Sequence, residues 1–296
     1  MKTDLYFIGI DGGGTKCRAR LEDASGALLG EGVSGPANIM RDSTLAISSM
    51  LDAVSKAIAQ SSMRIELQQC VVGAGLAGAN VTKARQVCEA WAHPFASFYL
   101  LSDLHAACIG AHNGAEGAAL IIGTGSSGTH WKDGVFHDVG GHGFPIGDIA
   151  SGAWLGLKAV QHTLLCFDGL APADRLFDAI RDKLNAEKAE DVVSACAEFN
   201  THHYASLVEA MLPLLYTSEG SVVALFQEGA NYVERVATRL LSDNKAPLAM
   251  IGGLSDIYAS KFSSQIKARL VSCQASPQQG ALFFAKSTHS QSKGVK

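Results

Sequence analysis

The chain lacks the features that mark several large classes of protein. Its seven cysteines form no C-x-x-C pair, which argues against a zinc finger, a disulfide exchanger or an iron–sulfur cluster. No apolar run reaches the length of a membrane span. The 24 lysines and arginines are scattered, so no basic patch for nucleic acid or an anionic membrane is evident. The ten histidines also lack the H-x-x-x-H spacing of a helical metal site. We therefore expect a small-molecule partner.

What the chain does contain is ample material for a folded core. Its 296 residues are 47% hydrophobic, enough for one large domain or two of ordinary size. The sequence starts directly with an apolar strand instead of the basic and then apolar residues of a secretion signal. With a net charge of −4, these properties predict a globular protein in the cytoplasm.

The most distinctive local pattern occurs twice. Residues 6–33, "YFIGIDGGGTKCRARLEDASGALLGEGV", have the order apolar strand, glycine turn, strand, second turn and strand. Residues 118–141, "AALIIGTGSSGTHWKDGVFHDVGG", repeat that order. A repeated three-stranded meander predicts two lobes of similar plan that can close on a ligand between their glycine turns.

The rest of the chain indicates an α/β protein. Strands alternate with helices up to residue 112, which is typical of a mixed or parallel sheet. Beyond residue 148 the pattern is mainly helical until an apolar strand in "PLAMIGGLSD". The polar last ten residues are expected to be frayed. The specific expectations are helices over 43–60, 80–92 and 104–112, and strands in "QQCVVGAGLAG" and "SFYLLSD".

The first glycine turn contains what a metal-bound nucleotide needs. Backbone N–H groups can contact phosphate oxygens, a hydroxyl can donate, and a carboxylate can hold Mg²⁺ through water. Glycines can also turn the chain with positive φ. The residues concerned are Asp11, Gly12, Gly13, Gly14, Thr15 and Lys16. The alternative is a hairpin whose turn is simply glycine-rich. The second turn, Gly123-Thr124-Gly125-Ser126, offers a matching cradle without an acid and so favours a nucleotide clamped between lobes.

Three polar residues follow predicted strands or lie in loops, and each has two interpretations. Asp103 ends "FYLLSD" and could cap the next helix or, at the carboxyl end of a strand, act as a general base. Asp148, in "GHGFPIGDIASGAWLGL", could also be a helix cap, but its Gly- and Pro-rich approach favours a ligand contact. Asn38, in "SGPANIM", is more typical of turn chemistry.

A dinucleotide-binding motif must also be weighed. Gly73, Gly75 and Gly78 match G-x-G-x-x-G between a strand and a helix, with Asp103 further along. This alternative leaves both meanders unexplained, and their strand pairs are antiparallel where a dinucleotide fold begins with a parallel unit. It predicts an oxidoreductase that binds NAD(H) or FAD without needing Mg²⁺.

Together these segments resemble a known family. "GIDGGGTKCRAR", "GAGLAG", "LLSD", "IIGTGSSG", "FPIGDIASGAWLGL" and "MIGGLSD" follow the order of the phosphate-1, connecting, catalytic, phosphate-2, sugar and adenosine segments of actin-like sugar kinases. The similarity covers nearly the whole chain and is strongest to bacterial glucosamine and N-acetylglucosamine kinases of the BadF/BadG ATPase group. It implies a duplicated ribonuclease-H-like fold with a ligand cleft, an N-terminal lobe over 1–113 and a C-terminal lobe over 114–296. The last helix would pack back on the N-terminal lobe.

The resemblance also implies a role for each matching residue. Asp11 matches the acid associated with Mg²⁺, and Thr15 and Thr124 match phosphate contacts. Asp103 matches the base that receives the proton of the sugar 6-hydroxyl. Asn38 and Asp148 match contacts to the sugar hydroxyls. The bend over which the adenosine of ATP lies matches Gly252 and Gly253.

Departures from related families narrow the expected substrate. His142 follows Gly140-Gly141 where animal N-acetylglucosamine kinases carry a tryptophan, which favours a free amino sugar over the N-acetyl form. The zinc-binding cysteines of ROK-type kinases are missing, as is the cluster-binding cysteine of acyl-CoA dehydratase activators.

We therefore predict a kinase that transfers the γ-phosphate of ATP to the 6-hydroxyl of glucosamine with Mg²⁺. The alternatives are an N-acetylglucosamine kinase of the same mechanism, or a non-catalytic protein that senses sugar and ATP. Such kinases often pair their subunits, so a homodimer is an open prediction.

Overall fold

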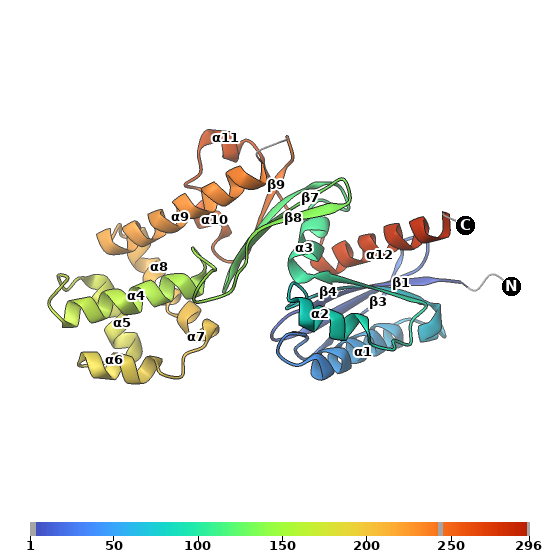
Figure 1. Cartoon of the computed structure of the whole chain (residues 1–296), viewed down its shortest axis with the longest axis horizontal. Helices are drawn as coiled ribbons and strands as arrows, with labels where there is room; N and C mark the ends of the chain where they lie inside the picture. Colours follow the sequence, from blue (N-terminus) through green and yellow to red (C-terminus); the bar gives the residue numbers. More distant parts are fainter. Residues whose placement is uncertain (1–3, 242–244, 295–296) are drawn as a thin grey trace. The chain divides into compact units, whose positions relative to one another are not determined.

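A computed structural model describes residues 4–241 and 245–294. The described chain divides into two compact units (Figure 1). Unit 1 is drawn from residues 1–119, 129–136 and 272–296, and unit 2 from residues 120–128 and 137–271. Strands β6, β7 and β8, defined below, contribute residues to both units. The predicted lobe boundary after residue 113, as a boundary between folding domains, stays a prediction.

Unit 1 is built on a mixed five-stranded sheet of order β3-β2-β1-β4-β5. Strands β1, β2 and β3 form the predicted antiparallel meander, and β1, β4 and β5 run parallel. Most residues of β1 and β2 are buried and the rest are only half-exposed, as expected of strands with two covered faces. The bounds are β1 (Tyr6–Gly12), β2 (Cys17–Glu22), β3 (Leu28–Ser34), β4 (Cys70–Leu76) and β5 (Ser97–Ser102).

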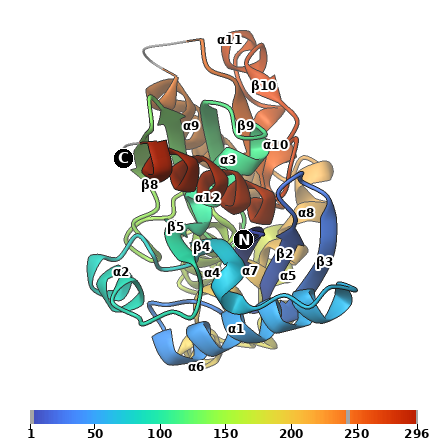
Figure 2. The same ribbon diagram turned by 90° about the vertical axis from the view of Figure 1, so that its right-hand side faces the viewer.

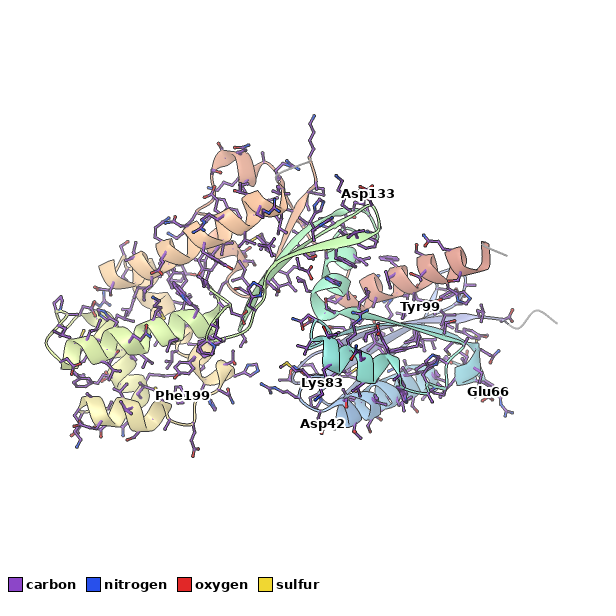
Figure 3. The ribbon with its side chains drawn as sticks, viewed as in Figure 1. Asp42, Glu66, Lys83, Tyr99, Asp133 and Phe199 are labelled. Atoms are coloured by element: carbon purple, nitrogen blue, oxygen red, sulfur yellow. The ribbon has the colours of Figure 1, made fainter. Side chains whose placement is uncertain are left out.

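Helices cover both faces of this sheet, with α1 and α12 on opposite sides (Figure 1). Met50 and Val54 of α1 join Ile8 and Ile10 of β1 in one core cluster. On the other face, Leu101 of β5 packs in a second cluster with residues of α3 and α12. Asp42 caps α1 by accepting a hydrogen bond from the Leu45 amide (Figure 3 labels Asp42). The bounds are α1 (Ser43–Gln60), the 3₁₀ turn η1 (Leu67–Gln69), α2 (Thr82–Glu89), α3 (Asp103–Ala111) and α12 (Pro277–Gly294).

Helix packing in unit 1 explains the first two glycines of the G-x-G-x-x-G pattern. Strand β4 lies between β1 and β5, and its residues are buried. A Cβ atom on Gly73 would lie 2.0 Å from the Ala281 carbonyl oxygen of α12, and one on Gly75 would lie 2.4 Å from the Ala106 Cβ of α3. Both glycines are therefore needed for two helices to approach the strand.

Helix α12 corrects the prediction of a frayed C-terminus. It lies across the sheet of unit 1 (Figure 2) and continues to Gly294, and residues 295–296 are outside the described part. Lys286 donates to Glu22 over 2.9 Å, and His289 Nδ1 lies 3.4 Å from the hydroxyl of Tyr99 (labelled in Figure 3). Contacts with β2 and β5 thus keep a polar segment helical, which local composition does not reveal.

The other five-stranded sheet, of order β10-β9-β6-β7-β8, draws residues from both units, and unit 2 contains most of the helices. The predicted second meander corresponds to β6, β7 and β8, and the mainly helical character after residue 148 is confirmed. The strands are β6 (Gly117–Ile122), β7 (Ser126–Lys132), β8 (Val135–Gly140), β9 (Leu248–Ile251) and β10 (Leu270–Val271). The helices are α4 (Gly152–Phe167), α5 (Arg175–Leu184), α6 (Ala189–Cys196), α7 (Thr201–Ser206), α8 (Val208–Tyr216), α9 (Gly220–Leu240), α10 (Ser255–Ala259) and α11 (Ser264–Lys267). Among the described residues, no helix has both the length and the hydropathy needed to cross a membrane.

Candidate active site

Two predicted acids lie at the same edge of the unit 1 sheet. The register pairs Asp11 with Gly75 across β1 and β4, and Leu76 with Ser102 across β4 and β5. Asp103 follows directly after Ser102, so both acids lie at the carboxyl ends of parallel strands. With one strand between them, their backbones are separated by about 10 Å. The sequence prediction that Asp103 faces the ligand edge of an α/β sheet agrees with this register.

The Asp11 carboxylate lies in a mixed electrostatic environment. Its side chain is only 22% exposed, and the nearest cation is Arg18, whose Nη1 lies 3.7 Å from Asp11 Oδ2. Burial raises the pKa of Asp11, Arg18 lowers it, and the negative charge of Asp103 raises it. Two carboxylates that repel one another at a strand edge form a place where a cation is favoured.

Asp103 is not the N-cap of α3, so the alternative in which it only caps this helix is wrong. It is the first residue of the helix, and Ser102 Oγ is the cap, accepting from the His105 amide over 3.1 Å. Asp103 Oδ1 accepts from the adjacent Leu104 amide over 3.0 Å, and burial raises the pKa of its carboxyl. A raised pKa is characteristic of a carboxylate tuned to accept a proton, so the general-base prediction stays open and gains support.

The first glycine turn is bare but not strained. Gly14, Thr15 and Lys16 are exposed, and the turn is closed by a hydrogen bond from the Gly13 amide to the Lys16 carbonyl over 3.0 Å. Gly12, Gly13 and Gly14 make this turn without a positive φ. No neighbouring atom lies within 4 Å of where a Gly14 Cβ would stand, so the backbone there is open to a ligand.

Asn38 performs the turn chemistry that its sequence context indicates. Its Oδ1 accepts from the Met40 and Arg41 amides over 3.0 and 3.1 Å. The neighbouring Ile39 amide bonds to the Ala77 carbonyl, and the Ala77 amide bonds to Gly12, which ties this loop to the first glycine turn. The predicted contact between Asn38 and a sugar stays untested.

The second glycine turn lies against the start of a long helix in unit 2. The Gly152 amide donates to the Gly123 carbonyl over 2.8 Å, and the Ala153 amide donates to Thr124 over 3.2 Å. These amides are the first two of the 16-residue helix α4. Because these amides already donate to the carbonyls of the turn, α4 contributes there through the field of its dipole, which is positive at this end.

Asp148 is fixed above that turn. Its φ is +57°, a value that favours glycine, and its Oδ1 accepts from the Gly143 amide over 3.2 Å. A Cβ atom on Gly125 would lie 2.8 Å from Asp148 Oδ2. Burial raises the pKa of Asp148, and His142 lowers it. The alternative of a helix cap is wrong, because Ser151 Oγ caps α4 by accepting from the Trp154 amide.

Gly252 and Gly253 form a tight bend after β9, as predicted. Gly252 has φ +109°, and a Cβ atom there would lie 2.3 Å from the Ile122 carbonyl oxygen. Position 253 is open, with no neighbouring atom within 4 Å of where a Cβ would stand. The Leu254 amide also bonds to Ile122, so the ends of β6 and β9 meet beside the second glycine turn.

Sequence reasoning missed two residues at these sites. Arg18 lies directly opposite Asp11 in the β1–β2 hairpin. Pairing residues of the two strands outward from the glycine turn could have identified it from the sequence. Tyr232 of α9 has its pKa raised by burial and by Asp148, and its hydroxyl would lie 3.2 Å from a Cβ on Gly140. No local pattern relates Tyr232 to a loop so distant in sequence.

Comparison with known proteins finds sugar kinases that match nearly the whole chain. Over 281 residues the chain is 34% identical to glucosamine kinase GspK of Vibrio cholerae, an alignment that covers 95% of each chain. The N-acetyl-D-glucosamine kinase of Dictyostelium discoideum is 24% identical, with 94% of this chain and 97% of that one aligned. The solved structure of a putative N-acetylglucosamine kinase from Chromobacterium violaceum has a TM-score of 0.87 at 28% identity, covering 96% of this chain and 99% of its own. The model of the BadF/BadG/BcrA/BcrD ATPase family matches residues 8–285, and the chain belongs to that family.

Proposed function

We propose that the protein is an ATP-dependent amino-sugar kinase that converts glucosamine to glucosamine 6-phosphate. The observation that carries the proposal is the half-buried Asp103 carboxylate, which follows β5 at the strand edge where Asp11 adjoins the first glycine turn. Membership of an ATPase family and the 34% identity to a glucosamine kinase support the same reaction.

In the proposed reaction the oxygen of the sugar 6-hydroxyl attacks the γ-phosphorus of ATP. The bond between that phosphorus and the β,γ-bridging oxygen breaks, and ADP leaves. Asp103 orients the hydroxyl and receives its proton. The raised pKa of Asp103 suits this role, because a carboxylate with a higher proton affinity is a stronger base.

The proposed metal partner of ATP is Mg²⁺, associated with Asp11. Mg²⁺ is commonly held by one or two carboxylates, substrate phosphates and water, and Asp11 supplies one such carboxylate beside a bare turn. Among the described residues, no group of three or more histidine, cysteine or acidic side chains could hold a metal ion. When bound, Mg²⁺ would neutralise phosphate charge.

The phosphates of ATP are proposed to contact both glycine turns. The amides and side chains from Gly12 to Lys16 would serve one, and the Gly123-Thr124-Gly125 turn beside the N-terminus of α4 would serve the other. The bend at Gly252 and Gly253 is proposed to carry the adenosine.

The sugar is proposed to contact Asn38 and Asp148. Asn38 Oδ1 already accepts two hydrogen bonds within its loop, so the side-chain NH₂ group of Asn38 would contact the sugar. The Asp148 carboxylate accepts from Gly143 through Oδ1, which leaves further acceptor positions for sugar hydroxyls. The Asp148 carboxylate and the nearby His142 form a polar environment, which suits a protonated amine better than an acetyl group.

N-acetylglucosamine is the second candidate substrate. It is favoured by the names of two similar proteins, from Dictyostelium discoideum and Chromobacterium violaceum. The mechanism would be the same.

The test is ATP consumption with Mg²⁺ in the presence of glucosamine, N-acetylglucosamine, glucose, mannose or no sugar, with products identified by mass. We expect turnover concentrated on glucosamine and its 6-phosphate as product. Asp103→Asn should bind nucleotide normally while kcat falls by about 10²–10⁴-fold. If no sugar gains a phosphate although sugar and ATP both bind, the protein is a sensor and the kinase proposal fails.

A further inference from the structure

Arg18 uses little of its hydrogen-bonding capacity within the chain, although it lies beside the first glycine turn. Its guanidinium makes one ion pair, Nη1 to Asp11 Oδ2 at 3.7 Å, and no hydrogen bond with any described residue. The side chain is 44% exposed. Since a guanidinium carries five N–H donors in a planar fork, Arg18 has donors available for a ligand.

Two other arginines of the same unit show what a structural role looks like. Arg20, two residues along β2, donates to Glu22 over 2.8 Å and pairs with Glu31 at 3.4 Å. Arg85 donates to Glu89 over 2.8 Å and to the Leu100 carbonyl over 2.9 Å. Arg18 has neither a short bond nor a second partner, so its guanidinium is free to change partners.

The strand register fixes where Arg18 lies. Asp11 and Arg18 are direct cross-strand partners, so both side chains lie on the same face of the sheet. The pair closes the hairpin one register position from Gly12 and Cys17, where the glycine turn begins. The guanidinium therefore lies at the edge where the phosphates of ATP are proposed to bind.

Charge favours an exchange of partners at this edge. The Asp11 carboxylate is repelled by the negative charge of Asp103 and attracted by the positive charge of Arg18. Phosphate oxygens are bidentate acceptors for a guanidinium, and such a pair is shorter and stronger than a single ion contact at 3.7 Å.

We propose that Arg18 is a catalytic residue whose guanidinium leaves Asp11 and binds the phosphoryl group during its transfer from ATP. This inference rests on the proposed function. It adds to that function a cation that holds the charge developing on the transferred group while Asp103 accepts the proton of the attacking hydroxyl. An arginine in this role accelerates phosphoryl transfer in other enzymes by about 10³–10⁵-fold.

The test compares Arg18→Gln with Arg64→Gln, a matched change at an arginine whose side chain is 93% exposed. We expect Arg18→Gln to lower kcat for glucosamine by at least about 10²-fold. KM for the sugar should change by less than about 3-fold, and Arg64→Gln should behave as wild type. Arg18→Lys should recover only part of the loss, because a point charge does not replace the planar fork.

A binding measurement separates this inference from the proposed function. ADP and ADP with aluminium fluoride, a mimic of the transferring phosphoryl group, are titrated calorimetrically with each variant. We expect Arg18→Gln to weaken binding of the fluoride complex by about 10-fold or more while binding of ADP alone changes little. Equal binding of the fluoride complex by both variants, or kcat of Arg18→Gln within about 3-fold of Arg64→Gln, would overturn the role of Arg18. If wild type makes no sugar phosphate, the proposed function fails, and the fluoride titration alone decides on Arg18.

Discussion

Replacing Glu22 by Gln should destabilise unit 1, because this carboxylate joins the C-terminal helix to the sheet. Glu22 is 8% exposed at its side chain and receives Arg20 Nε over 2.8 Å and Lys286 Nζ over 2.9 Å. Lys286 also lies 5.3 Å from the centre of the Phe7 ring. Glutamine keeps the shape and one acceptor oxygen but removes the negative charge that Lys286 pairs with, and leaves Arg20 with its 3.4 Å pair to Glu31.

The expected loss follows from the burial of the three groups. Removing one partner of a fully buried ion pair costs about 3–5 kcal/mol. Arg20 and Lys286 are 20% and 27% exposed, so water can recover part of that loss. We therefore expect Glu22→Gln to lower the free energy of unfolding by about 2 kcal/mol. The control is Asp52→Asn, whose partner Lys56 lies 2.7 Å away with both side chains 52% exposed, and which should cost less than about 0.5 kcal/mol.

Urea denaturation followed by circular dichroism measures both variants, and hydrogen exchange of amides in β2 and α12 localises the effect. We expect faster exchange in these two elements for Glu22→Gln and no change there for Asp52→Asn. Equal and small losses for the two variants, with unchanged exchange in α12, would refute the argument that buried charge holds this helix on the sheet.

Three further predictions concern the site. Burial raises the pKa of Asp103 above 3.8, so its ionised form is disfavoured in the folded state. Asp103→Asn should therefore raise Tm at neutral pH, and this gain should shrink as the pH falls through the raised pKa. A lower Tm of Asp103→Asn at neutral pH would contradict this prediction. The acid limb of kcat against pH should likewise lie above an ordinary carboxyl value, and constant kcat down to pH 3.8 would exclude Asp103 as the base. Gly75→Ala would place a Cβ atom 2.4 Å from that of Ala106, and calorimetry should show a lower Tm by several degrees together with a lower kcat, whereas an unchanged Tm would mean that α3 can shift freely.

Local patterns in the sequence were sufficient for most of the secondary structure. Helix α1 spans Ser43–Gln60, as predicted. Both meanders were predicted because glycine turns and alternating strands are encoded by neighbouring residues. The kinase-like order of motifs was equally readable, since each motif is a short segment.

Other features depended on backbone geometry and packing that local sequence patterns do not show. The sequence did not show that Ser102 and Ser151 cap the helices instead of Asp103 and Asp148, because a cap is chosen by backbone geometry a residue or two away. It did not show that Gly75 admits a helix, because Ala106 reaches it only in the fold.

The sequence by itself therefore determined the family, the α/β elements and which acids to consider, since these follow from local composition and order. Only the tertiary structure decided which acids share an edge and which cation faces them. The charges of Asp11 and Asp103 interact because only β4 lies between their strands. Arg18 faces Asp11 because the hairpin register aligns the two residues. Electrostatic coupling depends on distance in space, and strand pairing sets that distance.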